Sequence, residues 1–192
     1  MEILQAIQSR RSIAKVTTEE VSGNAIEQII QAGCWAPTHC RTEPWRFTVF
    51  TGDGRKKLQE AWDKNVSRTA YYKLSKIQEK SYRAPTIIAV WCAAGRGKKN
   101  PPVWEDHAAV ATCLQNMSFA CEALNLGSIW RTGDVVDMKE VQELCKTEED
   151  KFTEDKGDKI IGFLYVGHPD TSAVDPKRDI PEWKSKTYFI TG

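Results

Sequence analysis

The sequence predicts one α+β domain, and three features carry that prediction. Two nearly continuous apolar runs, at residues 85–92 and 159–167, are typical of strands buried on both faces of a sheet. Residues 104–124 are apolar on most sides, which indicates a buried helix. The 192 residues contain no internal repeat, low-complexity tract or linker, so we expect a single domain over residues 1–192.

The first part of the chain is expected to form two helices. Residues 3–9 form a short amphipathic helix that ends at the Ser-Arg-Arg-Ser of residues 9–12. The apolar residues on one face of this helix are Ile3, Leu4 and Ile7. A second helix follows Ser22, a suitable N-cap. It ends near residue 36, because the residue before Pro37 is pushed out of the α region.

The middle of the chain is expected to hold a strand, a helix and a basic loop. Residues 46–50 alternate as a strand, and residues 55–64 form a helix with one apolar face, made of Leu58, Ala61 and Trp62. The charged residues 65–83 are only weakly helical in pattern. The basic loop 95–99 lacks the spacing of a phosphate-binding Walker motif, so we expect a solvated connector there.

The last part of the chain follows the long helix. Gly127 is expected to end that helix as a left-handed cap, and residues 135–145 are expected to form a short helix capped by Asp137. The tail, residues 170–192, is rich in Pro, Lys and Asp but carries aromatic side chains near its end. Tails of this kind commonly reach across to a partner subunit.

The composition excludes several classes of protein. With 27 basic and 26 acidic residues, the chain has no net charge that would direct it to nucleic acid or a membrane. No run approaches the roughly 18 apolar residues of a membrane span, and no signal peptide is visible, so a cytoplasmic location is expected. The six cysteines lack zinc-site spacing, so we expect neither a metal site nor disulfides, and only Cys40 is a candidate for reactivity.

Two polar clusters are candidates for a binding site: the proline-bracketed loop 36–47 and the Trp-Arg-Thr-Gly of residues 130–133. Each has a structural alternative, a rigid turn for the first and a strand start with a weak surface ion pair for the second. The two arginines after the first helix either bind phosphate or merely complement the helix dipole. The run of residues 105–107, Glu-Asp-His, points in three directions on a helix and is expected to be an incidental surface cluster.

Common catalytic motifs are missing from the sequence. There is no G-x-G-x-x-G after a strand, no G-x-S-x-G elbow and no pair of histidines at metal-ligand spacing. The chain is therefore either a binding protein or one whose cofactor carries the chemistry.

Four motifs occur in a fixed order along the chain. They are Arg-Arg-Ser after the first helix, Ala-Pro-Thr followed by Pro-Trp-x-Phe, Asn-Leu-Gly-Ser-Ile-Trp-Arg-Thr-Gly after the buried helix, and a buried strand ending in Gly-His-Pro. In this order they resemble the nitroreductase family, most closely its small YdjA-like members, over nearly the whole chain. The resemblance implies an α+β, nitroreductase-like fold with a central, mostly antiparallel sheet flanked by helices. It also implies a homodimer with two FMN sites at the subunit interface.

The resemblance assigns residues to the cofactor. It implies that Arg-Arg-Ser holds the FMN phosphate and ribityl chain, that the Ala-Pro-Thr loop reaches the flavin of the partner subunit, and that Trp-Arg-Thr-Gly lies along the cofactor. The implied cofactor-binding residues are Arg10, Arg11, Ser12, Pro37, Thr38, His39, Trp130, Arg131, Thr132 and Gly133. Arg41 and Glu43 complete the set, at positions where the family has Asn and Gln. A carboxylate only accepts hydrogen bonds and would repel a reduced flavin, so Arg41 is expected to pair with Glu43.

The implied function is that of an FMN-dependent NAD(P)H oxidoreductase. NADH or NADPH would reduce the flavin and leave, and a nitroaromatic, a quinone or a similar small acceptor would then be reduced in a ping-pong sequence of hydride or electron transfer. No side chain is expected to act as acid or base, because the flavin carries the chemistry. The alternative is a flavin-binding carrier or sensor on the same fold, which Arg41 and Glu43 motivate. A plain interaction domain that uses the aromatic tail is a third hypothesis.

Overall fold

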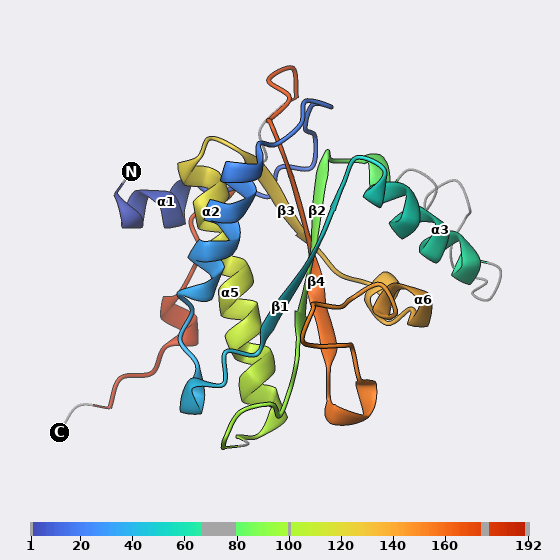
Figure 1. The fold of residues 1–192 in the computed structure, drawn as a ribbon. Helices are drawn as coiled ribbons and strands as arrows, with labels where there is room; N and C mark the ends of the chain where they lie inside the picture. The colour runs from blue at the N-terminus through green and yellow to red at the C-terminus, as the bar shows by residue number, and fades with distance from the viewer. Residues whose placement is uncertain (1, 67–79, 100, 174–176, 191–192) are drawn as a thin grey trace.

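Four strands form the antiparallel sheet around which the other elements are placed. A computed structural model describes residues 2–66, 80–99, 101–173 and 177–190. The strands are β1 (Trp45–Thr51), β2 (Thr86–Cys92), β3 (Gly127–Arg131) and β4 (Lys159–Gly167). Their order across the sheet is β1-β2-β4-β3, and each neighbouring pair is antiparallel (Figure 1). The two predicted buried runs are therefore the central strands β2 and β4, and β3 lies at an edge.

Helices cover both faces of this sheet, which confirms the predicted α+β fold. On one face lie α2 (Gly23–Cys34) and the long α5 (Val103–Ala123), while α3 (Gly54–Val66) and α6 (Lys139–Gln142) cover the other (Figure 1). The short α1 (Ile3–Ser9) lies beside α5. The other helical pieces in the described ranges are the 3-10 turns η1 (His39–Arg41), η2 (Lys80–Tyr82), η3 (Asp134–Val136), η4 (Glu154–Lys156) and η5 (Lys184–Lys186).

Each face of the sheet has its own apolar core, because side chains alternate along the central strands. In β2, Ile88 and Val90 face the helices α2 and α5, whereas Ile87, Ala89 and Trp91 face α3 and α6. Every residue of β2 is buried. A continuous apolar run thus signals a strand covered on both sides, as the sequence predicted.

Some local predictions are confirmed and others are wrong. The Ser22 hydroxyl accepts a hydrogen bond from the Ala25 N–H at 3.2 Å, which confirms the N-cap of α2. Gly127 does not cap α5; Asn125 takes the left-handed conformation, with φ 56°, and Gly127 opens β3. Glycine is needed at position 127 for space, because a Cβ there would lie 2.8 Å from Cγ2 of Ile13.

The single helix predicted over residues 135–145 is also wrong. The structure has η3 and α6 instead, and Met138 rather than Asp137 precedes α6, with no capping side-chain hydrogen bond. Val135, Val136, Met138 and Val141 are all buried. A continuous helix would spread these four side chains around its circumference. The break in the backbone allows all four to face the core.

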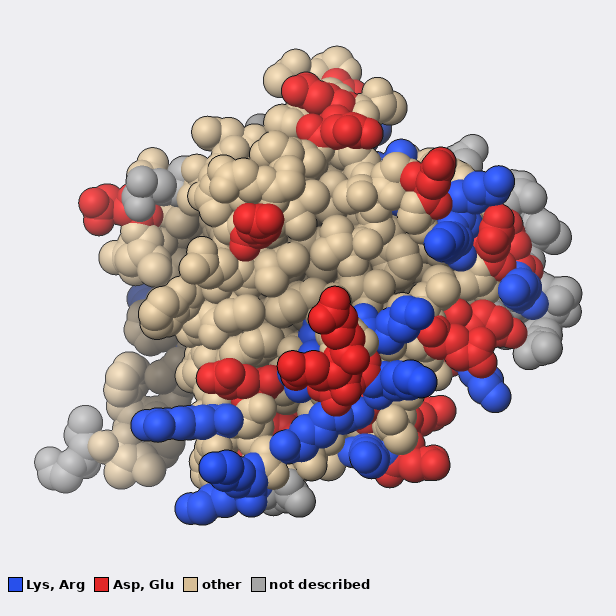
Figure 2. Space-filling model, in the orientation of Figure 1, with Lys and Arg blue, Asp and Glu red and all other residues tan. Residues whose placement is uncertain are grey.

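Parts of two predicted segments lie outside the described residues, namely residues 67–79 of the charged stretch and residues 174–176 and 191–192 of the tail. Within the described ranges, no helix combines the length and the apolar character that a membrane span requires. Acidic and basic side chains are intermingled on the face that Figure 2 shows, as expected from nearly equal numbers of each.

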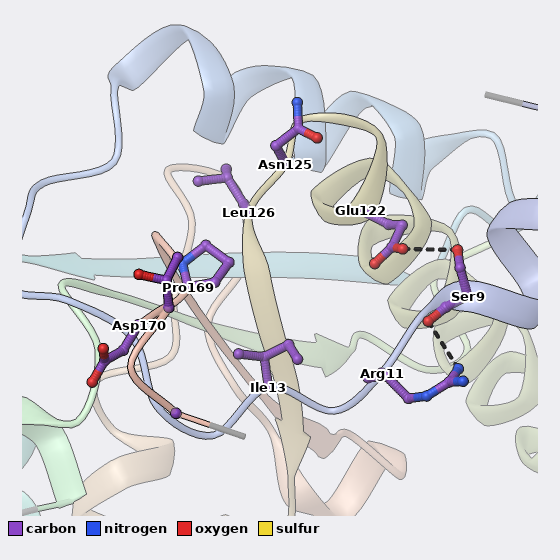
Figure 3. Close-up of a pocket in the computed structure, with 10 residues that line it drawn as sticks. Ser9, Arg11, Ile13, Glu122, Asn125, Leu126, Pro169 and Asp170 are labelled. Atoms are coloured by element: carbon purple, nitrogen blue, oxygen red, sulfur yellow. Dashed lines mark hydrogen bonds between the residues drawn. The ribbon is translucent and has the colours of Figure 1, made fainter. Parts of the chain in front are cut away.

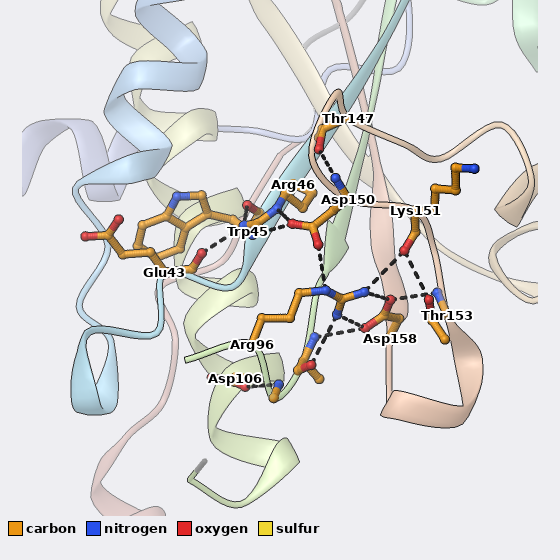
Figure 4. A network of polar contacts seen from close by, with 12 residues as sticks. Glu43, Trp45, Arg46, Arg96, Asp106, Thr147, Asp150, Lys151, Thr153 and Asp158 are labelled. Atoms are coloured by element: carbon orange, nitrogen blue, oxygen red, sulfur yellow. Dashed lines mark hydrogen bonds and ion pairs between the residues drawn. The ribbon is translucent and has the colours of Figure 1, made fainter. Parts of the chain in front are cut away.

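The basic loop 95–99 is more than the solvated connector that the sequence predicted, because Arg96 lies at the centre of an ion network (Figure 4). Its Nη1 and Nη2 donate to the two oxygens of Asp158 at 2.5 and 2.7 Å, and its Nε lies 2.7 Å from Asp150. Arg46 of β1 binds the same Asp150 at 2.6 Å. The Asp158 side chain has no exposed surface and also accepts the N–H groups of Ala94 and Thr153. The network thereby joins the start of β1 to two loops.

Removing the buried carboxylate should destabilise the fold strongly. We expect Asp158→Ala to lower the free energy of unfolding by about 3–5 kcal/mol, because it leaves the Arg96 guanidinium without its bidentate partner. Urea unfolding followed by circular dichroism measures this. The control is Asp155→Ala, an exposed carboxylate on η4, which should change stability by no more than about 0.5 kcal/mol. Equal effects of the two variants would contradict the assigned role of the network.

Candidate functional site

An extended segment after α1 lies beside the edge strand β3. The N–H of Ile13 donates to the Ser128 carbonyl at 2.9 Å, which holds this segment against the strand. Side chains alternate along an extended backbone, so neighbouring residues point to opposite sides. Arg10 and Ser12 accordingly line one cavity, while Arg11 and Ile13 line another. The predicted Arg-Arg-Ser motif is therefore divided between two sides of the segment.

The cavity at Arg10 and Ser12 brings together two of the predicted motifs. Its volume is about 310 Å³, and Trp130 and Thr132 also line it. The remaining lining residues, none of them predicted, are Gln115, Ser118 and Ser128. The cavity therefore contains guanidinium, hydroxyl and amide donors together with an indole ring, on the side of β3 that faces α5. We call this the β3 cavity.

Arg11 occupies a different place from its neighbours. Its Nη1 donates to the carbonyl oxygens of Gln8, Ser9 and Arg10, at 2.7, 2.8 and 3.1 Å, and so caps the end of α1. Figure 3 shows its side chain turned back toward the Ser9 carbonyl in a cavity of about 420 Å³ that Glu122 and Asp170 also line. Of the two interpretations of these arginines, the helix-end role is the one that the geometry gives to Arg11.

Arg10 lies in a region of crowded positive charge. Burial lowers the pKa of Arg10, and the nearby guanidinium of Arg178 lowers it further, against the opposing effect of Glu122. Arg178 belongs to the C-terminal tail and lines a cavity of about 550 Å³ between α1 and the tail, together with Arg11 and Trp183. An anion bound between Arg10 and Arg178 would relieve their mutual repulsion.

The segment 130–133 turns its side chains to both faces of the sheet. Trp130 lies on the α5 side, where its Nε1 donates to the Ile161 carbonyl at 3.2 Å. Arg131 lies on the opposite side, with its guanidinium carbon 5.5 Å from the centre of the Tyr165 ring. Thr132 lines both the β3 cavity and an adjoining cavity of about 570 Å³, which Gly133 also lines. Gly133 has φ 103°, a conformation that favours glycine.

Arg131 belongs to a cluster of cations. Burial lowers the pKa of Lys80, and the charges of Arg83 and Arg131 lower it further, while Asp134 acts in the opposite direction. Burial also raises the pKa of Tyr165 to about 12, against the opposing effects of Arg131 and Arg83. The Nε of Arg131 is buried and has no hydrogen-bond partner among the described residues. An electron-rich group at this position would satisfy that donor and balance the charge.

The loop 36–47 does not line the β3 cavity of its own chain. It packs on the first turns of α5, where Nδ1 of His39 lies 2.5 Å from Glu105 and the Thr42 hydroxyl donates to Asp106 at 2.7 Å. Cys40, Arg41 and Glu43 all have positive φ, between 44° and 54°. Such conformations cost on the order of 1 kcal/mol or more each for residues other than glycine and cluster at functional sites. This loop is therefore held in a strained shape.

Two expectations about this region are wrong. Arg41 and Glu43 do not pair with each other among the described contacts; the Glu43 carboxylate points away from the ion network, and only its carbonyl binds Arg46 (Figure 4). The run 105–107 is not merely a surface cluster, although its side chains do diverge as expected. Asp106 is almost fully buried and accepts both the Thr42 hydroxyl and the Gly95 N–H. A single carboxylate thereby holds two loops on α5.

Several residues of the site were not predicted, although two of them break the apolar pattern of α5 in the sequence. Gln115 and Ser118 are polar positions within the apolar helix α5, and that exception to the pattern was detectable. Arg178 lies in the C-terminal tail, which the sequence predicted to reach a partner subunit and not to join the cofactor site. Lys80 and Arg83 come near Arg131 only through folding, and no local pattern marks them. Within the described residues, no group of three or more His, Cys, Asp and Glu could hold a metal ion.

Comparison with known proteins identifies the family of this chain. The model of the Nitroreductase family matches residues 7–168, most of the chain. The chain belongs to the nitroreductase family. The Escherichia coli (strain K12) protein named "Putative NAD(P)H nitroreductase YdjA" is 29% identical over 175 residues, which is 90% of this chain and 91% of that protein.

Solved structures of nitroreductases share the fold. A nitroreductase-like family protein from Bacillus cereus is 25% identical with a TM-score of 0.78, over 100% of this chain and 97% of that one. A Desulfovibrio desulfuricans protein described as a "putative nitroreductase in complex with fmn" is 27% identical with a TM-score of 0.66, over 94% and 93% of the two chains. Arg10 at the β3 cavity, with Arg178 close to it, fits a phosphorylated cofactor of this kind.

The buried Asp106 should control the order of the loop 36–47. We expect Asp106→Ala to lower the free energy of unfolding by about 2–4 kcal/mol, because the Thr42 hydroxyl and the Gly95 N–H lose their acceptor. Amide hydrogen exchange should also become faster at residues 38–43. The neighbouring variant Glu105→Ala removes an exposed ion pair and should cost less than about 1 kcal/mol. Unchanged exchange at residues 38–43 in Asp106→Ala would contradict this role.

Proposed function

We propose that the protein is an FMN-dependent NAD(P)H oxidoreductase that reduces nitroaromatic, quinone or similar small acceptors in a ping-pong sequence. One observation carries the proposal: Arg10, Ser12, Trp130 and Thr132, from two distant segments, line a single cavity along the edge strand. Family membership and a relative described as an FMN complex support it. Bound FMN would supply the transfer of hydride or electrons between NAD(P)H and the acceptor.

The phosphate and ribityl end of the cofactor would lie at Arg10 and Ser12. Arg10 and Arg178 offer guanidinium groups that match phosphate geometry, and an anion between them would relieve the repulsion that lowers the pKa of Arg10. The hydroxyl of Ser12 and the amide of Gln115 would serve the ribityl hydroxyls. Arg11 would contribute charge from the far side of the segment while it caps α1.

The ring end of the cofactor would lie at residues 130–133. Trp130 would offer an apolar face, and the backbone N–H groups of Thr132 and Gly133 would donate to the ring system. Arg131, with Lys80 and Arg83 beside it, lies on the opposite side of β3 and would favour through its charge alone the negative charge that a reduced flavin acquires. In this arrangement the protein binds and polarises the cofactor, and no side chain needs to transfer a proton.

The site would be completed in a homodimer. Pro37, Thr38 and His39 lie outside the β3 cavity of their own chain, so they would approach the flavin of the partner subunit, with Arg41 and Glu43 nearby. Large apolar side chains are exposed on α1, at the start of α5 and along the tail. They are Ile3, Leu4, Ile7, Val103, Trp104, Ile180, Trp183, Tyr188, Phe189 and Ile190. A second copy of the chain would cover these side chains, with the tail reaching across.

Titration with FMN, followed by quenching of flavin fluorescence, tests this proposal. The wild-type protein should bind FMN, and Arg10→Ala should weaken binding about 10- to 100-fold, because a charge-assisted hydrogen bond to phosphate is lost. Lys15→Ala removes the same charge from the same segment outside the cavity and should change affinity less than about threefold. Wild-type protein that does not quench FMN would overturn the proposal.

The reduction potential of the bound cofactor should depend on Arg131. We expect Arg131→Met to shift the midpoint potential about 20–60 mV in the negative direction, since one nearby cation is worth on the order of 1–3 kcal/mol to the reduced form. Equilibration with reference dyes during anaerobic reduction measures the potential. Lys56→Met, an exposed position on α3, is the control and should leave it unchanged. A positive shift in Arg131→Met would contradict the assigned role.

A further inference from the structure

The side chain of Trp130 lies across the neighbouring strand at Gly162. Strand β3 ends at Arg131, opposite Phe163, and β4 continues beyond that point. The indole fills the space beside this continuation, where its Nε1 binds the Ile161 carbonyl. A Cβ at position 162 would lie 2.0 Å from Trp130 Nε1, 2.5 Å from its Cδ1 and 3.0 Å from the carbonyl oxygen of Arg131. Any residue other than glycine at 162 would therefore displace the indole.

The φ angle does not by itself require glycine at this position. Gly162 is not among the described residues with positive φ, although the pairing of β4 with β2 is irregular beside it, since Val90 lies opposite Gly162 and Trp91 lies opposite Ile160. Glycine weakens a strand interior and often marks a bulge or a close approach by another group. The approaching group here is the indole of Trp130. The ring makes the closest approach of the neighbouring atoms, at 2.0 Å, and is therefore the strongest reason for glycine here.

We infer that Gly162 is a positioning residue for the cofactor site and acts through Trp130. Because Gly162 has no side chain, the indole can lie against β4, where its hydrogen bond to the Ile161 carbonyl fixes its orientation. In this orientation the indole forms a wall of the β3 cavity beside Ser12 and Thr132. A binding surface fixed before the ligand arrives avoids the entropic cost of ordering it on binding. This inference rests on the proposed function, in which the β3 cavity takes FMN.

A double-mutant cycle tests whether Gly162 acts through the indole. Gly162→Ala alone should raise the dissociation constant for FMN about tenfold or more, because the added methyl group expels the ring. In the Trp130→Ala background no ring is present to expel and only the 3.0 Å approach to the Arg131 carbonyl remains, so the same substitution should change the constant by about threefold or less. Gly23→Ala, where an added methyl group meets nothing within 4 Å, is the matched control. Equal effects of Gly162→Ala in both backgrounds, or none in either, would overturn the inference.

A measurement without FMN separates the inference from the proposed function. The fluorescence that Trp130 contributes is the difference between each protein and its Trp130→Phe counterpart. Acrylamide should quench this contribution more strongly in Gly162→Ala than in the wild type, because the displaced indole is more exposed. If the wild type binds no FMN, the proposed function fails, and the quenching result alone then decides whether Gly162 seats the indole. Unchanged quenching would show that it does not.

Discussion

The early end of the edge strand β3 is the constraint on which the candidate site depends. β3 stops at Arg131 while β4 extends four residues further, to Lys159. The Trp130 side chain lies beside the part of β4 that has no pairing partner in β3. The turn at Thr132 and Gly133 begins directly after the end of β3. The extended segment after α1 is hydrogen-bonded to the same strand. Two segments far apart in the sequence therefore meet at one edge of the sheet.

Much of the fold was predictable from the sequence, because long apolar runs admit few interpretations. Strand β4 and the helix α5 follow from composition and periodicity alone. The break at Met138 was not predictable from the sequence. It arises because the buried side chains before and after it must all face the same core. The buried role of Arg96 was equally hidden, because its partners Asp150 and Asp158 lie more than fifty residues away.

The candidate site was predictable as a set of motifs but not as an arrangement. Successive side chains of an extended segment point to opposite sides, so the sequence alone indicated that Trp130 and Arg131, and likewise Arg10 and Arg11, lie on different sides. The approach of Lys80 and Arg83 to Arg131 was not, since it depends on tertiary placement. The strained backbone at Cys40 and Arg41 was also hidden, because its support comes from the buried carboxylate of Asp106 on another element.

The central claim is that this chain binds FMN and exchanges electrons with NAD(P)H. The most direct test is the visible absorbance spectrum of the purified protein, recorded without oxygen before and after addition of NADPH or NADH. We expect the bands of oxidised flavin in the starting protein, and their bleaching by at least one of the two nucleotides. Protein without flavin absorbance, even after incubation with FMN, would contradict the claim. Bound flavin that neither nucleotide bleaches would instead identify a carrier or sensor on the nitroreductase fold.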